Sequence, residues 1–273
     1  MDYSFILTLF FFGILGGFIS GLLGVGGGII FVPILSTSLA SLGYGDEELA
    51  KYILANSFAA TFFAGAISTF KQYKLNSFYP REILLTASLA IPASLLISHL
   101  IAAGTWYNKA TFSYFFIFLL AFMLYRMIAS SKSVFKPNSR EIKPWHYPIT
   151  GALSGLISGL SGLGGGVIMV PLFTQYLKLD IKKAASISIG VIPTMMIPML
   201  ILYGTYTPTQ EIIEWHWGYL LPSIFLPLVA GLLFAAPLGV SVGQKASSKY
   251  LKIIFAVLVF IVIIKTIASI IFT

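Results

Sequence analysis

Residues 20–35 read SGLLGVGGGIIFVPIL, and residues 158–173 read SGLSGLGGGVIMVPLF. Ten of these sixteen positions are identical at a fixed offset of 138 residues, with the flanking serine, valine and proline also in register. The offset is about half of the 273-residue chain, so the sequence indicates an internal duplication.

Each copy of the motif interrupts an apolar stretch with a run of glycines. Successive glycines weaken a helix by roughly 1 kcal/mol each and allow positive φ angles. We therefore expect turns at Gly24–Gly28 and Gly162–Gly166, each lying between two half-helices. Irregular backbone at membrane depth is tolerated only inside protein or against a water-filled cavity, so both turns should face the interior.

The composition around the motifs is that of an integral membrane protein. Hydrophobic residues make up 58% of the chain and charged residues 10%, whereas soluble domains average roughly 45–50% and 25%. A soluble globule, a disordered chain and a coiled coil are excluded. The net charge of +8 comes from basic residues in short loops, which points to membrane orientation and not to nucleic acid.

Ten apolar runs follow one another along the chain. Six approach the ~20 residues that a helix needs to cross the hydrocarbon core, and the first is of borderline length. Three other runs, at 29–42, 149–160 and 167–177, are too short to span the membrane and should end inside it. The ten runs are 5–23, 29–42, 52–70, 83–103, 112–129, 149–160, 167–177, 184–203, 219–240 and 253–272.

Loop charges decide how these runs thread the membrane. Continuous spans through both glycine motifs would place two basic loops on opposite faces, against the positive-inside rule. If each motif is instead a hairpin that returns to its starting face, every basic loop lies inside and every acidic loop outside. The basic clusters are Lys71/Lys74/Arg81, Lys132/Lys136/Arg140/Lys143, Lys178/Lys182/Lys183 and Lys245/Lys249/Lys252; the acidic loops hold Asp46/Glu47/Glu48 and Glu211/Glu214.

This threading predicts the fold class. Each half is a broken-helix hairpin plus three transmembrane helices, so it crosses the membrane an odd number of times, and the two halves become inverted repeats. The prediction is an all-α membrane protein of about ten helical segments with both termini outside. Its parts are a first repeat at 1–131, a cytoplasmic linker at 132–147 and a second repeat at 148–273.

The glycine motifs are the candidate substrate site. The second half-helix of each hairpin presents free N–H groups and the positive end of its dipole to the turn. Two such ends that meet near the midplane would bind an anion, and glycine allows close approach to the backbone. Tight helix packing is the competing explanation. The candidate residues are Gly24, Gly26, Gly27, Gly28, Gly162, Gly164, Gly165 and Gly166.

Polar residues in the following helices extend this candidate site. Asn56 and Ser57 lie after the first hairpin, and Ser186 and Ser188 lie after the second. They could donate hydrogen bonds to an oxyanion or join neighbouring helices. Asn56 ranks first because a buried amide without a partner is costly, and Thr61 and Thr194 rank below it as packing residues.

The pattern of ionisable residues argues against catalysis. All nine carboxylates lie in loops or at helix ends, so a proton relay through the membrane is not expected. His99 lies near the outer end of its span. No catalytic residue, metal site or cofactor is predicted, and the chain is not expected to be an enzyme.

The doubled motif resembles the TauE/SafE family of membrane permeases. The matching residues are Gly21–Gly28 with Val32-Pro33 and Gly159–Gly166 with Val170-Pro171, and Ala55–Phe58 is similar to the family's Ala-x-Ser-Leu-type segment, with Asn56 where threonine is common. The resemblance covers the whole chain. It implies a prokaryotic plasma membrane and export of sulfite, organosulfonates or a related small oxoanion or carboxylate.

The resulting hypothesis is a secondary transporter that exports small sulfur-containing or organic anions by alternating access. The expected partners are the anion and the lipid bilayer, with a homodimer as the candidate assembly and no nucleic acid. Three alternatives remain open. They are an anion channel of the same architecture, an intramembrane enzyme using Ser161 and His99, and a structural subunit.

Overall fold

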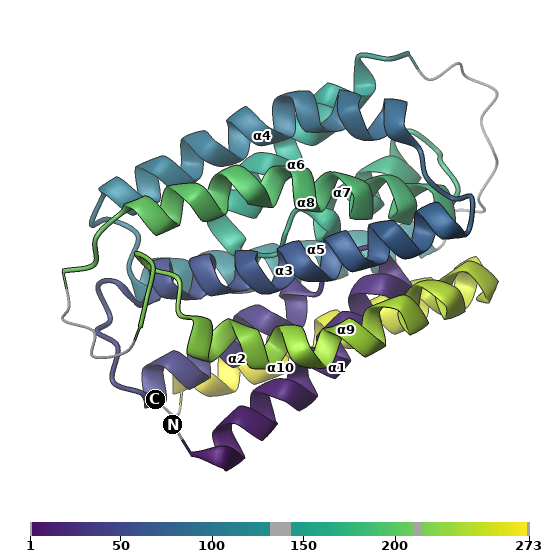
Figure 1. The fold of residues 1–273 in the computed structure, drawn as a ribbon. Coiled ribbons are helices and arrows are strands. Elements are labelled where there is room, and N and C mark those ends of the chain that lie inside the picture. Colours follow the sequence, from purple (N-terminus) through teal and green to yellow (C-terminus); the bar gives the residue numbers. More distant parts are fainter. Residues whose placement is uncertain (1, 132–142, 210–214, 272–273) are drawn as a thin grey trace.

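The computed structural model describes residues 2–131, 143–209 and 215–271, which form ten helices (Figure 1). No named strand occurs in these three ranges; Trp217 and Leu220 form one isolated bridge. Six of the helices are long and apolar enough to cross a membrane. The helices are α1 (Tyr3–Leu23), α2 (Gly28–Ser41), α3 (Leu49–Lys74), α4 (Pro80–Ala103), α5 (Lys109–Ser131), α6 (His146–Ser161), α7 (Gly166–Gln175), α8 (Ile181–Thr205), α9 (Pro222–Lys245) and α10 (Ser248–Ile271).

The predicted all-α class and the predicted interruptions are confirmed. Helix α1 ends at Leu23 and α2 begins at Gly28, while α6 ends at Ser161 and α7 begins at Gly166. The three short runs are helices of 14, 16 and 10 residues, and α1 has 21. Prolines begin α4 and α9, where the missing N–H costs no helical hydrogen bond.

The two ends of the bundle differ in charge. The acidic end carries the connections α2–α3 and α4–α5 and the described parts of α8–α9; the basic end carries α3–α4, α7–α8 and α9–α10 (Figure 1). Helices α1 and α6 begin at opposite ends, and the start of α1 and the end of α10 both lie at the acidic end (Figure 1). The residues Lys132, Lys136, Arg140, Glu211 and Glu214, and most of the expected linker, lie outside the described residues.

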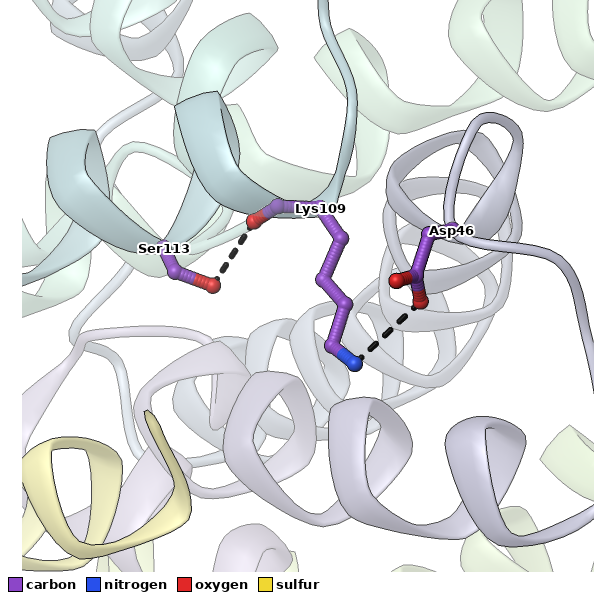
Figure 2. Close-up of polar contacts among 3 residues, drawn as sticks. All are labelled: Asp46, Lys109 and Ser113. Atoms are coloured by element: carbon purple, nitrogen blue, oxygen red, sulfur yellow. Dashed lines mark hydrogen bonds and ion pairs between the residues drawn. The ribbon is translucent and has the colours of Figure 1, made fainter. Parts of the chain in front are cut away.

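At the acidic end, contacts join the α2–α3 connection to the start of α5. Figure 2 shows Lys109 Nζ at 3.2 Å from a carboxylate oxygen of Asp46, which joins the start of α5 to the α2–α3 connection. The Lys109 carbonyl oxygen also accepts a hydrogen bond from the Ser113 hydroxyl at 2.8 Å. The Lys109 backbone N–H donates to the Asp46 carbonyl at 3.1 Å, so backbone and side chain hold the same two segments.

We expect the Lys109→Met variant to change stability and transport little. The Asp46 side chain is 73% exposed, and exposed ion pairs contribute roughly 0–1 kcal/mol. The backbone hydrogen bond between the two segments is kept in the variant. Thermal unfolding in detergent measures this, and a loss of more than about 2 kcal/mol would show that the ion pair matters more than its exposure implies.

Each hairpin packs mainly against a helix of the other half. Helix α1 runs along α9, and α6 runs along α4. Glycines at every fourth position form a ridge on α1 (Gly13, Gly17, Gly21) and on α6 (Gly151, Gly155, Gly159). A Cβ added at these positions would overlap α9 or press against α4, so the ridges permit close helix packing. Two further contacts, α3 with α9 and α4 with α8, also join one half to the other and involve helices at corresponding places in the two halves.

Helices α3 and α8 form the centre of the bundle and pack against each other. Most of the side chains in the first half of each are fully buried. Large apolar side chains are exposed instead on α4, α5 and α10, such as Leu84, Phe118 and Phe260, as expected for a surface that faces lipid. The inverted relation of the halves stays a prediction. The matched contacts of α1 with α9 and of α6 with α4 are compatible with it.

Candidate functional site: two glycine loops at the centre

Two four-residue loops, 24–27 and 162–165, separate the half-helices and are called here the first and second glycine loops. In the first loop, Gly24, Gly26 and Gly27 have φ angles of 77°, 82° and 75°. In the second, Gly162, Gly164 and Gly165 have φ angles of 73°, 75° and 76°. The spacing of the glycines in both motifs therefore follows from the left-handed backbone at three of four positions.

The two glycine loops touch each other. A Cβ built on Gly28 would lie 2.7 Å from the Leu163 Cα, and one built on Gly166 would lie 2.7 Å from the Val25 Cα. All residues of both loops, together with Gly28 and Gly166, are buried in the protein. The loops therefore meet in the interior, as the sequence predicts, and are closed off from solvent in this conformation.

Serines on the two central helices hold these loops in a crossed arrangement. The Ser57 hydroxyl on α3 donates a 2.7 Å hydrogen bond to the carbonyl oxygen of Gly162. The Ser188 hydroxyl on α8 donates a 2.8 Å hydrogen bond to the carbonyl oxygen of Gly24. Each central helix thus binds the loop of the opposite half. In this conformation both hydroxyl protons are used by the protein, so these serines position the loops.

Four backbone amides at the end of each loop and the start of the following helix have no hydrogen-bond acceptor among the described residues. In the first half they belong to Gly26, Gly27, Gly28 and Ile29; in the second half they belong to Gly164, Gly165, Gly166 and Val167. The first turns of α2 and α7 add the positive ends of two helix dipoles. Among the described residues, the atoms nearest to a Cβ built on any of these glycines belong to the backbone or to uncharged side chains, so the main chain supplies the positive potential here.

Thr61 and Ile192 lie beside both loops. The Thr61 methyl would contact a Cβ on Gly26 and overlap one on Gly164, and Ile192 packs on the same two glycines from α8. The Thr61 hydroxyl is fully buried and has no hydrogen-bond partner among the described residues. Thr61 lies twelve residues, about 18 Å, into the 26-residue helix α3, which is close to its midpoint.

Thr61, which the sequence ranks below Asn56 as a packing residue, is a polar candidate whose side chain lies against both glycine loops. It lies four residues after Ser57, one turn further along the same face of α3. This i, i+4 spacing from a serine was visible in the sequence. The contact with both glycine loops was not, because it depends on how α3 crosses the two hairpins.

Asn56 makes its hydrogen bonds to its own helix and to the turn before α9. Its Nδ2 donates to the carbonyl oxygens of Tyr52 at 2.8 Å and Tyr219 at 3.1 Å. Its Oδ1 accepts the backbone N–H of Leu221 at 2.8 Å. Asn56 therefore fastens the turn before α9 to α3, which satisfies the buried amide without a ligand.

Ser186, Thr194 and His99 make their hydrogen bonds to other parts of the protein, whereas the Ser161 Oγ accepts the Leu163 backbone N–H of the second loop at 3.3 Å. Ser186 lies 3.5 Å from Gln244 Nε2 towards the basic end, and the Thr194 hydroxyl donates to the Val191 carbonyl in its own helix at 2.6 Å. His99 Nδ1 lies 2.9 Å from the Tyr206 hydroxyl at the acidic end. The Ser161 hydroxyl donates to the Ile157 carbonyl, so Ser161 and His99 are engaged in different places.

Known proteins similar to this chain over nearly its whole length are membrane transporters by name. The profile of the family described as "Sulfite exporter TauE/SafE" matches residues 9–266. The "probable membrane transporter protein MJ0441" of Methanocaldococcus jannaschii is 28% identical over 94% of this chain and 94% of its own length. A "probable membrane transporter protein" of Haemophilus influenzae is 28% identical over 96% and 98%, and YunE of Bacillus subtilis, similarly named, is 23% identical over 95% and 96%.

Proposed function

The chain belongs to the TauE/SafE sulfite exporter family and is a multi-pass membrane transporter, and we propose that it exports small sulfur-containing or organic anions such as sulfite or sulfonates. The membrane is the plasma membrane of a prokaryote. The basic end faces the cytoplasm and the acidic end, with both termini, faces outside.

The meeting of the two glycine loops carries this proposal. Amides without acceptors and two helix N-termini converge there beside the buried Thr61 hydroxyl. These groups are hydrogen-bond donors, so they favour an anion with several acceptor oxygens. The nearest atoms that a Cβ built on the glycines of either motif would meet in the described part of the chain are all uncharged, so the anion is held by dipoles and can leave again without breaking an ion pair.

The contact between the loops supports alternating access as the mechanism. Gly28 and Leu163 leave no room for an anion between them, so binding requires the loops to separate. The crossed bonds of Ser57 and Ser188 connect each loop to the opposite central helix. A rocking of α3 against α8 would therefore move both loops together and open the site to one end at a time.

The membrane potential favours export without a coupling ion. An inside-negative potential drives an anion outward with roughly 2.3 kcal/mol per charge per 100 mV. The anion leaves towards the acidic end, where the described carboxylates Asp46 and Glu48 lie. Export down this gradient is compatible with a centre built from main-chain amides and hydroxyls.

Purified protein in liposomes tests the proposal. Vesicles loaded with sulfite and given a potassium–valinomycin potential, positive on the receiving side, should lose sulfite in a saturable and potential-dependent way. Unlabelled external sulfite should stimulate exchange. Absence of sulfite, sulfoacetate and taurine flux would refute anion export. Linear flux far above ~10³ per second without counterflow would instead identify a channel of the same architecture.

The Thr61→Val variant should bind the anion more weakly while the empty protein becomes more stable. Valine keeps the shape of threonine and removes a buried hydroxyl that has no partner, which stabilises the unliganded state by about 1 kcal/mol. The lost donor should raise the KM for sulfite about fivefold to tenfold. Thr194→Val is the matched control, since its hydroxyl bonds its own helix. Equal KM values in wild type and Thr61→Val would remove Thr61 from the site.

A further inference from the structure

Lys51 is buried at the acidic end of α3 and has no ion-pair partner in the described part of the chain. Its side chain is 7% exposed, and its Nζ donates one hydrogen bond, at 3.1 Å, to the carbonyl oxygen of Ala102. The same Nζ lies 5.5 Å from the centre of the Tyr219 ring. The two ion pairs found among the described residues, Lys109–Asp46 and Lys183–Glu82, do not include it. An ammonium has three donors, so two of them stay available.

The nearest carboxylate, Glu48, is turned to other partners. It accepts hydrogen bonds from the Tyr219 hydroxyl at 2.5 Å and from the Thr209 backbone N–H at 3.1 Å. Burial and the neighbouring Glu48 raise the pKa of Tyr219 well above its usual range, so this phenol stays protonated and donates. Glu48 therefore attracts Lys51 through its charge, while the Ala102 carbonyl accepts the hydrogen bond of the ammonium.

Two further hydroxyls lie beside the groups that Lys51 contacts. Ser98 is one turn before Ala102 on α4, and the Tyr203 hydroxyl from α8 faces it. Both hydroxyls are fully buried and have no hydrogen-bond partner of good geometry in the described part of the chain. The Tyr219 ring also packs edge-on against the Tyr203 ring, with centroids 6.3 Å apart. We call Lys51, Ser98, Tyr203 and Tyr219 the Lys51 cluster.

The equivalent position in the second half lacks these features. Lys182 lies 131 residues after Lys51, the same separation as Ser188 from Ser57, and its Nζ donates to the Gln244 carbonyl near the end of α9. Both lysines therefore cap the last turn of a helix, which is a common structural role. Lys182 is partly exposed, however, and water can solvate its remaining donors. Of these two lysines, Lys51 is the buried one, with the buried Ser98 and Tyr203 hydroxyls beside the groups it contacts.

We propose that the Lys51 cluster is a second, transit binding site for the exported oxoanion, between the glycine loops and the acidic end. This inference rests on the proposed anion transport. Lys51 lies ten residues, about 15 Å, before Thr61 along α3, so it is separated from the central site. A buried ammonium is costly without a counter-charge. An anion leaving the centre supplies that charge, with Ser98 and Tyr203 donating to its oxygens.

The test compares Lys51→Met with Lys182→Met in sulfite counterflow and in thermal unfolding. Both variants lose a helix-end contact, so their Tm values without ligand should be similar. The KM for sulfite applied from the acidic end should rise about tenfold, equivalent to ~1.4 kcal/mol, in Lys51→Met and stay within twofold in Lys182→Met. Sulfite should raise the Tm of Lys51→Met less than that of wild type.

Milder variants keep the test decisive if Lys51→Met fails to fold. Tyr203→Phe and Ser98→Ala each remove one unpartnered donor and should raise the same KM about threefold, whereas Lys51→Arg should stay near wild type. Unchanged KM values in Lys51→Met, or in both hydroxyl variants, would overturn the transit site while wild-type flux still supports anion export. Absence of flux and of sulfite stabilisation in wild type would refute the proposed function and the transit site together.

Discussion

The Gly165→Asp variant is expected to lose anion transport, while Gly165→Asn keeps a measurable fraction of it. Gly165 has a φ of 76°, a conformation that aspartate and asparagine both tolerate better than other side chains. An added Cβ would meet the ends of two flexible side chains, Met169 Cε at 2.9 Å and Met195 Cε at 3.1 Å, which can move. The two variants therefore place nearly equal volume in the second glycine loop.

The charge makes the difference between these two variants. A carboxylate about 4 Å from a bound anion repels it by roughly 4 kcal/mol at an effective dielectric of 20, or about a thousandfold. Liposome efflux rates, normalised to the amount of folded protein, measure this ratio. Equal rates for Gly165→Asp and Gly165→Asn would show that the anion passes elsewhere and would remove the glycine loops as the site.

Gly28→Ala and Gly166→Ala are expected to have equal and large effects on stability and flux. A Cβ at Gly28 would lie 2.7 Å from the Leu163 Cα, and one at Gly166 would lie 2.7 Å from the Gly24 carbonyl oxygen. These neighbours are backbone atoms of the opposite loop, so the loops must move apart. Overpacking of this kind costs roughly 1–3 kcal/mol, and it also prevents the closed contact between the halves.

Gly43→Ala is the control for these alanine variants. Gly43 has a φ of 83° and no atom within 4 Å of an added Cβ. An alanine at this position therefore strains the backbone without causing a clash. Its flux should stay near wild type with a stability loss of about 1 kcal/mol. Thermal unfolding and counterflow measure both quantities. A large difference between Gly28→Ala and Gly166→Ala would show that the two loops do not play equivalent roles.

Most of the fold could be predicted because its signals are local. The repeated glycine motif fixes the position of both breaks, and the loop charges assign each connection to one end. The glycines at every fourth position before each motif also carried a packing signal, but glycine spacing does not identify the partner helix. That α1 packs on α9 and α6 on α4 emerges only in three dimensions.

The site was predicted less completely because its contacts join residues far apart in sequence. The Ser57–Gly162 and Ser188–Gly24 hydrogen bonds link positions 105 and 164 residues apart. The two serines, expected as ligand donors, therefore bind loop carbonyls that the sequence does not place near them. Asn56 is a buried amide, as expected, but its hydrogen-bond partners include Tyr219 and Leu221, in the segment just before α9. Burial predicts that a polar group needs a partner and does not identify that partner.

The glycine ridges of α1 and α6 have an evolutionary consequence. Each ridge is covered by a helix encoded in the other half of the gene, so a chain of half this length could not bury its own ridge. An ancestral half-length protein would have needed a second copy to supply that cover, and in the predicted inverted arrangement that copy would have been inserted in the opposite direction. Gene duplication and fusion would then have made permanent a pairing that two separate polypeptides first formed by dual insertion.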